Sequence, residues 1–204
     1  MTNSSTAPLH SSPQSRPPAT DHSPDFEHYP SGFRSSVILR VSREGNVILR
    51  PIAPEDEPAM RRFHEALSEE TIYDRYFEHF SLEGRIDHQR LARVCANTAN
   101  SFALVAEQLG VSGRPAEILA VGRLIVEEPY VASFALLVRD DARSLSLDGA
   151  VLRRLITLAR AFGFQLLVDD NLVSNHDLLN LCRKLGFSLH TIPDEGLVRV
   201  SLRL

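Results

Sequence analysis

Residues 131–162 decide the fold, and they read VASFALLVRDDARSLSLDGAVLRRLITLARAF. The apolar run at 131–138 is typical of a strand that is covered on both faces. After a polar connection, apolar residues return at helical spacing, as at Val151 and Leu155, which predicts an amphipathic helix over Gly149–Phe162. A core strand, a loop and a helix therefore follow one another at the centre of the predicted domain.

The same patterns predict further elements on either side. They are a hairpin of strands 37–41 and 47–51, a helix from 54, helices 69–77 and 87–95, strands 102–106 and 118–126, strand 165–168, helix 175–185 and strand 197–204. Because short connections join the strands at 102–106, 118–126 and 131–138, we expect an antiparallel meander there. The predicted fold class is α+β, a mixed and mostly antiparallel sheet with helices on both faces.

The composition limits the kinds of function. The chain has 204 residues, of which 43% are hydrophobic and 24% charged, and its formal net charge is −4. Such a chain is expected to be soluble, and its mild acidity argues against nucleic acid or a membrane as partner. Two cysteines, Cys95 and Cys182, predict reduced thiols and a cytoplasmic protein. The histidines show no metal-ligand spacing, so no metal is expected.

Residues 1–33 differ in composition from the rest of the chain. They are rich in proline and serine and contain almost no aliphatic residues. Such a segment cannot bury enough apolar surface to offset the entropy of ordering. We therefore predict a disordered tail over 1–33, which adds nothing to the core, and a folded domain over 34–204.

Four motifs follow one another along that domain. They are VILRPIAPED at 47–56, IYDRYF at 72–77, FALLVRDD at 134–141 and NHDLLNLCRKLGF at 175–187. Together they resemble the GNAT acyltransferases, in particular bacterial protein lysine acetyltransferases and the GNAT domains fused to acyl-CoA synthetases. The resemblance implies a splay between the fourth and fifth core strands, here 131–138 and 165–168. It also implies an N-acyltransferase that uses acetyl-CoA or a related acyl-CoA, with a protein lysine or a small amine as acceptor.

The resemblance also implies where acyl-CoA binds. The pantetheine amides would pair with the exposed edge of strand 131–138, and the pyrophosphate would meet the amides that open helix 149–162. The binding residues implied in this way are Leu137, Val138, Arg139, Arg143, Ser144, Ser146, Asp148, Gly149 and Asn175.

The phosphate-binding loop departs from the Arg/Gln-x-x-Gly-x-Gly/Ala pattern of the family. Arg143 fills the first position, but Ser146 replaces the middle glycine and Asp148 replaces the last small residue. A carboxylate near the pyrophosphate would cost on the order of 1–4 kcal/mol in charge repulsion. In the alternative interpretation, Ser146 or Asp148 simply caps the helix.

The general base is the second departure. Ser133 stands where related enzymes often have a glutamate, and a serine cannot hold a proton at neutral pH. Asp170 and Glu128 are our candidate catalytic residues, with Glu127 and Asp169 beside them in sequence. The alternative is that these acids are only solvated strand ends.

Three further positions have two interpretations each. Asn175 would contact the pantetheine, or cap the last helix. Arg75 would lie on the acceptor side, or pair with Asp74 or Glu78 at the surface. Cys182 has the register in which many GNAT enzymes carry a tyrosine that protonates the leaving thiolate, although a small core residue is the simpler explanation.

The two departures leave a second function open. Because Ser133 and Asp148 make the base and phosphate positions degenerate, the chain could be a GNAT-like binding or regulatory domain without catalysis. A third hypothesis is an interaction module whose tail carries the function. Low micromolar affinity for acetyl-CoA would favour the acyltransferase, and millimolar or no affinity would favour the regulatory domain. The third hypothesis would be favoured if removing residues 1–33 abolished a partner interaction but left ligand binding unchanged.

Overall fold

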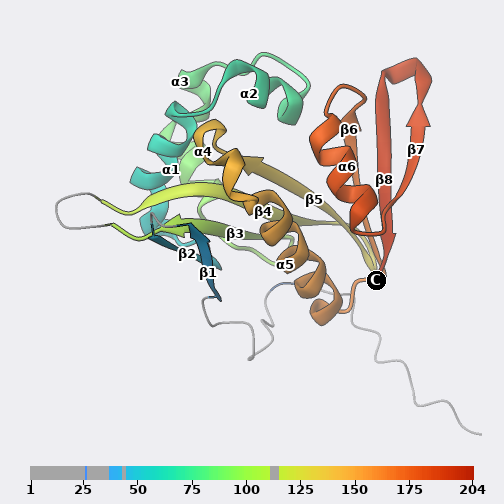
Figure 1. Cartoon of the computed structure of the whole chain (residues 1–204), viewed down its shortest axis with the longest axis horizontal. Helices are drawn as coiled ribbons and strands as arrows, with labels where there is room; N and C mark the ends of the chain where they lie inside the picture. Colours follow the sequence, from blue (N-terminus) through green and yellow to red (C-terminus); the bar gives the residue numbers. More distant parts are fainter. Residues whose placement is uncertain (1–25, 27–36, 43–44, 111–114) are drawn as a thin grey trace, which may run out of the picture.

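The computed structural model describes residues 26, 37–42, 45–110 and 115–204. Their strands form one sheet in the order β1-β2-β3-β4-β5-β6-β8-β7 (Figure 1). The strands are β1 Val37–Ser42, β2 Gly45–Pro51, β3 Ser101–Gln108, β4 Glu117–Glu128, β5 Val131–Val138, β6 Leu166–Leu172, β7 Ser188–Ile192 and β8 Leu197–Arg203. The helices are α1 Glu57–Glu65, α2 Glu69–Tyr76, α3 Leu82–Arg85, α4 His88–Val94, α5 Leu147–Phe162 and α6 His176–Lys184.

The pairing of the strands confirms the predicted fold class. Neighbouring strands are antiparallel except for β5 and β6, which are parallel. Two elements were not predicted. The helix α3 is only four residues long, and β7 is a mostly exposed edge strand without an apolar run. In addition, β6 continues to Leu172, four residues past the predicted end.

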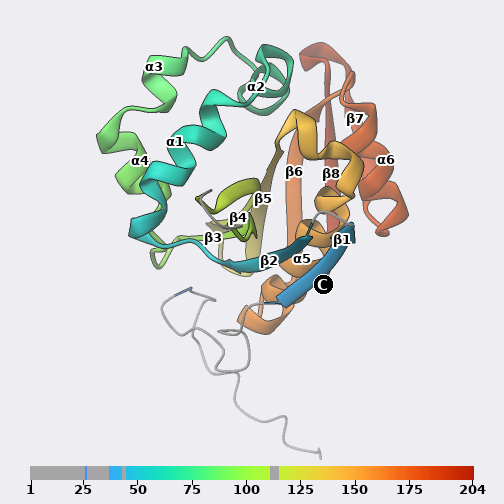
Figure 2. The ribbon, with the colours of Figure 1, turned by 60° about the vertical axis from the view of Figure 1, so that its left-hand side comes forward.

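The helices cover the two faces of the sheet (Figures 1 and 2). On one face, α1, α2 and α4 bury a cluster that includes Phe63, Ile72 and Leu91. On the other face, α5 and α6 bury a larger cluster that includes Leu152 and Cys182. Each helix therefore packs its apolar side against the sheet, as the sequence periodicity predicts.

The splay between β5 and β6 is present where the family resemblance implies it (Figure 1). The two strands pair only between Val131–Ser133 and Leu166–Val168. Beyond that point β5 stays paired with β4 up to Val138, whereas β6 stays paired with β8 up to Leu172. The edge of β5 that faces β6 therefore has no strand partner from Phe134 onward.

Gly122 on β4 allows α5 to lie close to the sheet. A Cβ atom at this position would be 2.3 Å from Val151 Cγ1 and 3.0 Å from Leu155 Cδ1. Real side chains do not approach so closely, so any larger residue would push α5 away. The close packing of α5 on β4 fixes the helix start beside the open end of β5.

The predicted tail at 1–33 lies outside the described residues, with the exception of Phe26. Its ring is 5% exposed and packs against Phe102, Phe162 and Phe164. Its backbone N–H donates a hydrogen bond to the Ala99 carbonyl at 3.2 Å. The expectation that this segment adds nothing to the core is therefore wrong at Phe26, because one aromatic ring suffices for anchoring. The boundary at 33/34 stays a prediction.

Candidate active site

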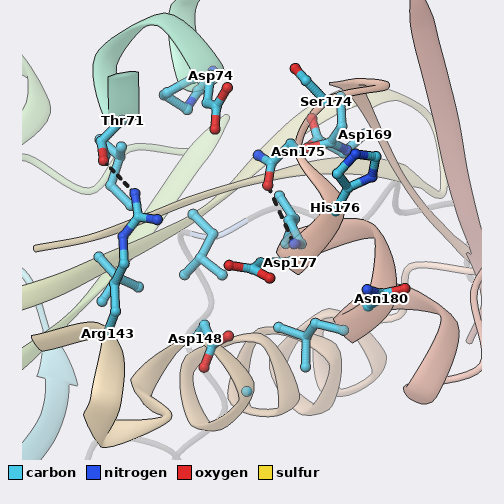
Figure 3. Close-up of a pocket in the computed structure, with 18 of the residues that line it drawn as sticks. Thr71, Asp74, Arg143, Asp148, Asp169, Ser174, Asn175, His176, Asp177 and Asn180 are labelled. Carbon is cyan, nitrogen blue, oxygen red and sulfur yellow. Dashed lines mark hydrogen bonds between the residues drawn. The ribbon is translucent and has the colours of Figure 1, made fainter. Parts of the chain in front are cut away.

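A cavity of about 770 Å³ opens where β5 and β6 diverge. Its walls come from α2, the end of β5, the start of α5, β6 and α6 (Figure 3). Its volume is in the range of cavities that bind cofactors and other small molecules. The cavity is therefore the candidate site.

The β5 wall offers backbone groups to a ligand. Leu136, Leu137 and Val138 line the cavity, and they belong to the part of β5 that β6 leaves unpaired. Unpaired strand amides and carbonyls can form the hydrogen bonds of a missing neighbouring strand. An extended molecule that carries amide groups would fit this edge.

The N-terminus of α5 offers a second set of backbone donors. Ser146 occupies the N-cap position with a φ of 53°, and its side chain forms no capping hydrogen bond. Asp148 is already the second residue of the helix and cannot be its N-cap. Ser146 is therefore the N-cap residue, as one interpretation has it, although its side chain makes no capping hydrogen bond, and Asp148 is not the cap because the helix begins earlier than predicted. Its first N–H groups and positive dipole end remain available to an anion.

Arg153 is a cavity residue that the sequence analysis missed. A Cβ atom at Gly149 would lie 3.3 Å from Arg153 Nη2, so the guanidinium folds back over the first turn of α5. Both residues line the cavity, as does Asp148 on the same turn. In Figure 3, Asp148 and Asp177 project from α5 and α6 toward the space between the helices. The spacing of four residues between Gly149 and Arg153 is the signal that could have revealed the contact.

These charges lead to a prediction about acetyl-CoA affinity. Replacing Asp148 with asparagine removes a negative charge beside the proposed phosphate position, and we expect about 10-fold tighter binding, equivalent to roughly 1.4 kcal/mol. Replacing Arg153 with glutamine should weaken binding to a similar extent. Calorimetry at low and high salt measures both effects, which should shrink as salt screens the charges. Equal affinities for all three proteins would contradict a pyrophosphate at this helix end.

Arg143, also a predicted binding residue, connects the cavity to α2. Its Nη2 atom donates to Thr71 Oγ1 at 2.6 Å and lies 3.1 Å from Asp140 Oδ1 (Figure 3). Asp140 in turn accepts a hydrogen bond from the Ser68 backbone N–H at 2.8 Å. The loop before α5 is thus tied to the start of α2, on the side of the cavity away from α6.

Asn175 starts α6 and satisfies both of its interpretations. Its side-chain oxygen accepts a hydrogen bond from the Leu178 backbone N–H at 3.3 Å, so it is the N-cap (Figure 3). It also lines the cavity. The cap fixes the side chain in place, and the contact with a ligand remains a prediction.

Two of the implied binding residues do not reach the cavity. The guanidinium of Arg139 forms two hydrogen bonds with Asp141, at 2.6 and 2.9 Å, and one with Glu117 at 3.2 Å. Ser144 is exposed and is not part of the cavity wall. The other implied residues do line the cavity: Leu137, Val138, Arg143, Ser146, Asp148, Gly149 and Asn175.

The structure does not favour either candidate catalytic residue. Glu128 pairs with Val131 at the turn between β4 and β5, which is the end of β5 remote from the open splay. Asp170 lines the cavity, but Arg199 binds both of its carboxylate oxygens at 2.8 and 2.6 Å. This ion pair lowers the pKa of Asp170. A carboxylate that is held ionised is a weak proton carrier near neutral pH.

Asp169 is better placed for proton transfer. It lines the cavity and directly follows Val168, the last residue of β6 that pairs with β5. Burial is the main cause that raises the pKa of Asp169 to about 7, and the positive charge of Arg75 opposes the rise. Because side chains alternate along a strand, Asp169 shares with Leu167 the face covered by α5 and α6. Perturbed carboxyl groups of this kind are typical of catalytic sites.

Ser133 and Cys182 do not supply a titratable group to the cavity. Ser133 Oγ donates a hydrogen bond to Glu127, and neither residue is part of the cavity wall. Burial, together with the charge of Asp169, raises the pKa of the Cys182 thiol to about 12. Cys182 therefore stays protonated and packs in the core, as the simpler explanation has it.

Several solved structures share this arrangement of strands and helices. No family model matches the sequence. The GNAT domain of S. lividans PAT superposes with a TM-score of 0.71 at 22% identity, over 86% of this chain and 99% of that domain. The chain has the GNAT fold. A putative acetyltransferase of Salmonella typhimurium, solved with its cofactor acetyl-CoA, gives a TM-score of 0.59 at 19% identity, over 78% of this chain and 95% of its own.

One curated relative agrees with the structural likeness. An acetyltransferase of Pseudomonas aeruginosa is 28% identical over 152 residues, which are 74% of this chain and 80% of that protein. The resemblance to GNAT N-acetyltransferases is therefore confirmed. Among the described residues of this chain, no helix is long and apolar enough to cross a membrane. Nor do those residues contain a group of three His, Cys, Asp or Glu side chains that could hold a metal ion.

Proposed function

We propose that this GNAT chain transfers an acetyl group, or a related acyl group, from acyl-CoA to the nitrogen of an amine. The observation that carries the proposal is the open edge of β5, followed after the 3-10 helix Asp140–Leu145 by the N-terminus of α5, where Ser146 forms no side-chain capping hydrogen bond. Acyl-CoA has the matching chemistry, since its pantetheine arm carries amides and its pyrophosphate is an anion. The acetyltransferase from Salmonella typhimurium, which has a similar fold, was solved with acetyl-CoA.

Residues of three elements would hold acyl-CoA. The backbone of Leu136–Val138 would pair with the pantetheine, and Asn175 would contact it from α6. The first N–H groups of α5 would bind the pyrophosphate, with Arg143 and Arg153 supplying positive charge. The bound thioester supplies the acyl group that is transferred.

The transfer needs two proton movements. The acceptor nitrogen forms a bond to the acyl carbon while the bond between that carbon and sulfur breaks. The nitrogen then releases a proton and the departing thiolate gains one. We assign to Asp169 the donation of the proton that the thiolate gains. The neutral form of Asp169 is available below pH 7, and the residue lies on the α6 side of the splay. The acceptor would enter as the free amine and release its own proton to water.

The alternative is a domain that binds acyl-CoA without transferring the acyl group. The absence of a glutamate at Ser133 favours it, as do the positions of the two candidate bases, since Asp170 is held by Arg199 and Glu128 lies at the end of β5 remote from the splay. Both proposals share the cavity and differ only in turnover.

Turnover is therefore the test. The full chain is incubated with acetyl-CoA and a panel of amino acids, small amines and lysine-containing peptides, and release of the CoA thiol is followed together with the mass of the product. We expect thiol release that depends on the acceptor, and a product heavier by one acetyl group. Binding of acetyl-CoA without any product would support the regulatory alternative, and absence of binding would contradict both.

A further inference from the structure

A second and smaller pocket adjoins the cavity on the opposite side of β5. It measures about 60 Å³ and lies between the sheet and helices α1, α2 and α4. Arg75, Leu136 and Leu137 line both the cavity and this pocket. A group in the small pocket would therefore lie within reach of the open edge of β5. Its polar walls are Arg75, Arg123, His64 and Tyr76.

Positive charge gathers around this pocket. The guanidinium carbons of Arg75 and Arg90 lie 5.4 and 5.5 Å from the centre of the Tyr76 ring. Arg123 donates to two neutral oxygens, Ser101 Oγ at 2.7 Å and the Val94 carbonyl. Throughout the described part of the chain, no carboxylate forms a salt bridge with any of these three arginines. The cluster therefore has no paired carboxylate, and Asp169, whose carboxyl group interacts electrostatically with Arg75, is a neutral acid below pH 7.

A buried histidine side chain also lines the pocket. His64 is only 3% exposed, and its Nδ1 atom has no hydrogen-bond partner. Burial is the main cause that lowers the pKa of His64 to about 4, and the charges of Arg85 and Arg90 add to it. The imidazole is thus neutral and can donate one N–H. An unsatisfied buried polar atom costs free energy unless a ligand or water pairs with it.

We propose that this arginine pocket, formed by Arg75, Arg123 and His64, binds an anionic group of the acceptor, namely a carboxylate carried close to the reacting amine. The inference deepens the proposed acyl transfer and depends on it. Guanidinium groups match a carboxylate in charge and geometry, and a ligand carboxylate would supply the missing counter-ion. The small volume leaves room for such a group and little more. The acceptor class is therefore an amino acid or a similar amino carboxylate.

The competing acceptor class is a cationic one. Glu70 and Asp74 project charge from α2 into the large cavity, and they would attract a second amine. These acids do not line the small pocket, whose charged walls are arginines. A protein lysine carries no carboxylate beside its amine, so it would leave the arginine pocket unpaired. An amino carboxylate acceptor therefore predicts that an anionic ligand binds most tightly, whereas a cationic acceptor predicts that a cationic ligand does.

Three probes of similar size separate these classes without requiring turnover. N-acetylglycine is anionic, N-acetylglycinamide is its neutral isostere, and N-(2-aminoethyl)acetamide is cationic. Each is titrated into the full chain by calorimetry, with and without saturating CoA. We expect N-acetylglycine to bind about 10-fold more tightly than either other probe, the factor that corresponds to about 1.4 kcal/mol. High salt should reduce the preference.

Two variants connect the preference to the pocket. Arg75→Gln should reduce the preference for N-acetylglycine to less than about twofold, equivalent to a loss of roughly 1 kcal/mol. Arg93→Gln is the matched control, because Arg93 is exposed on α4 and lines neither pocket, so the preference should persist. Equal affinity for the three probes, preference for the cationic probe, or loss of preference in both variants would overturn the inference. Failure of the proposed function would show separately, as absence of acetyl-CoA binding.

Discussion

Asp169→Asn should lower kcat for acetyl transfer by about 10²- to 10⁴-fold, the usual contribution of a general acid or base. The change keeps the size of the side chain and removes its proton. Affinity for acetyl-CoA should stay within about twofold, because the proposed complex holds the ligand by backbone groups of β5 and α5. Steady-state kinetics and calorimetry together measure this separation of kcat from binding.

The pH profile tests the same assignment. The pKa of Asp169 is raised to about 7, so the neutral acid predominates below that pH and is lost above it. For wild type we expect kcat to fall above pH 7 with a single titration. The asparagine variant should lack this fall, because its side-chain amide does not titrate. A fall above pH 7 that persists in the variant would contradict the role of Asp169.

Stability gives a readout that does not depend on catalysis. Because the pKa of Asp169 is about 7 in the folded chain and its ordinary value is 3.8, folding favours the neutral form. The neutral carboxyl carries no penalty below pH 3.8, and stability is lost as the pH rises from there through 7. The difference between the two pKa values corresponds to a loss of at most roughly 4 kcal/mol in the free energy of unfolding. Asp169→Asn should therefore stabilise the chain at pH 8 relative to wild type, with a smaller gain at pH 5, in urea denaturation.

Asp170→Asn is the matched control for this variant. It makes the same chemical change one residue along β6, on the opposite face, and removes only the exposed pair with Arg199. We expect a change in kcat of less than about tenfold and little loss of stability, since solvent screens an exposed ion pair. If Asp170→Asn abolishes turnover while Asp169→Asn does not, Asp170 is the proton carrier.

Phe26→Ala should destabilise the fold by about 3–5 kcal/mol, the usual cost of removing a buried phenylalanine ring. The ring closes a group of aromatic side chains, with centroids 4.8 Å from Phe162 and 5.5 Å from Phe164. Urea denaturation of the full chain measures the loss. Ile38→Ala is the control, because Ile38 is 62% exposed and should lose less than about 1 kcal/mol. If Phe26→Ala lowers the free energy of unfolding no more than Ile38→Ala does, the ring of Phe26 adds little to the core.

Apolar periodicity predicts most of the fold, because it reports which face of each element is buried. It identifies β5 and α5 within two residues, whereas the splay and the proposed phosphate site at the start of α5 come from the family resemblance. It fails at β7, where an exposed edge strand needs no apolar run. It also fails at Phe26, since a single buried ring inside a polar segment leaves no pattern in its neighbours.

The candidate site is less predictable, because it depends on contacts between distant elements. Asp169 and Asp170 are identical neighbours in sequence, and only the pairing of β6 with β8 places Arg199 beside one of them. The arginine pocket joins residues from α1, α2 and β4, each unremarkable alone. By contrast, the predicted binding residues at the start of α5 and α6 follow from the family resemblance, and most of them do line the cavity.

Hydrogen exchange with and without saturating acetyl-CoA tests the central claim most directly. If acetyl-CoA lies along the free edge of β5 and ends at α5, the amides of 134–138 and 147–150 should exchange more slowly when it is bound. Backbone hydrogen bonds to a ligand protect the same amides that the splay leaves open. Unchanged exchange in both segments at millimolar acetyl-CoA would contradict the claim that this GNAT chain binds acyl-CoA in the splay.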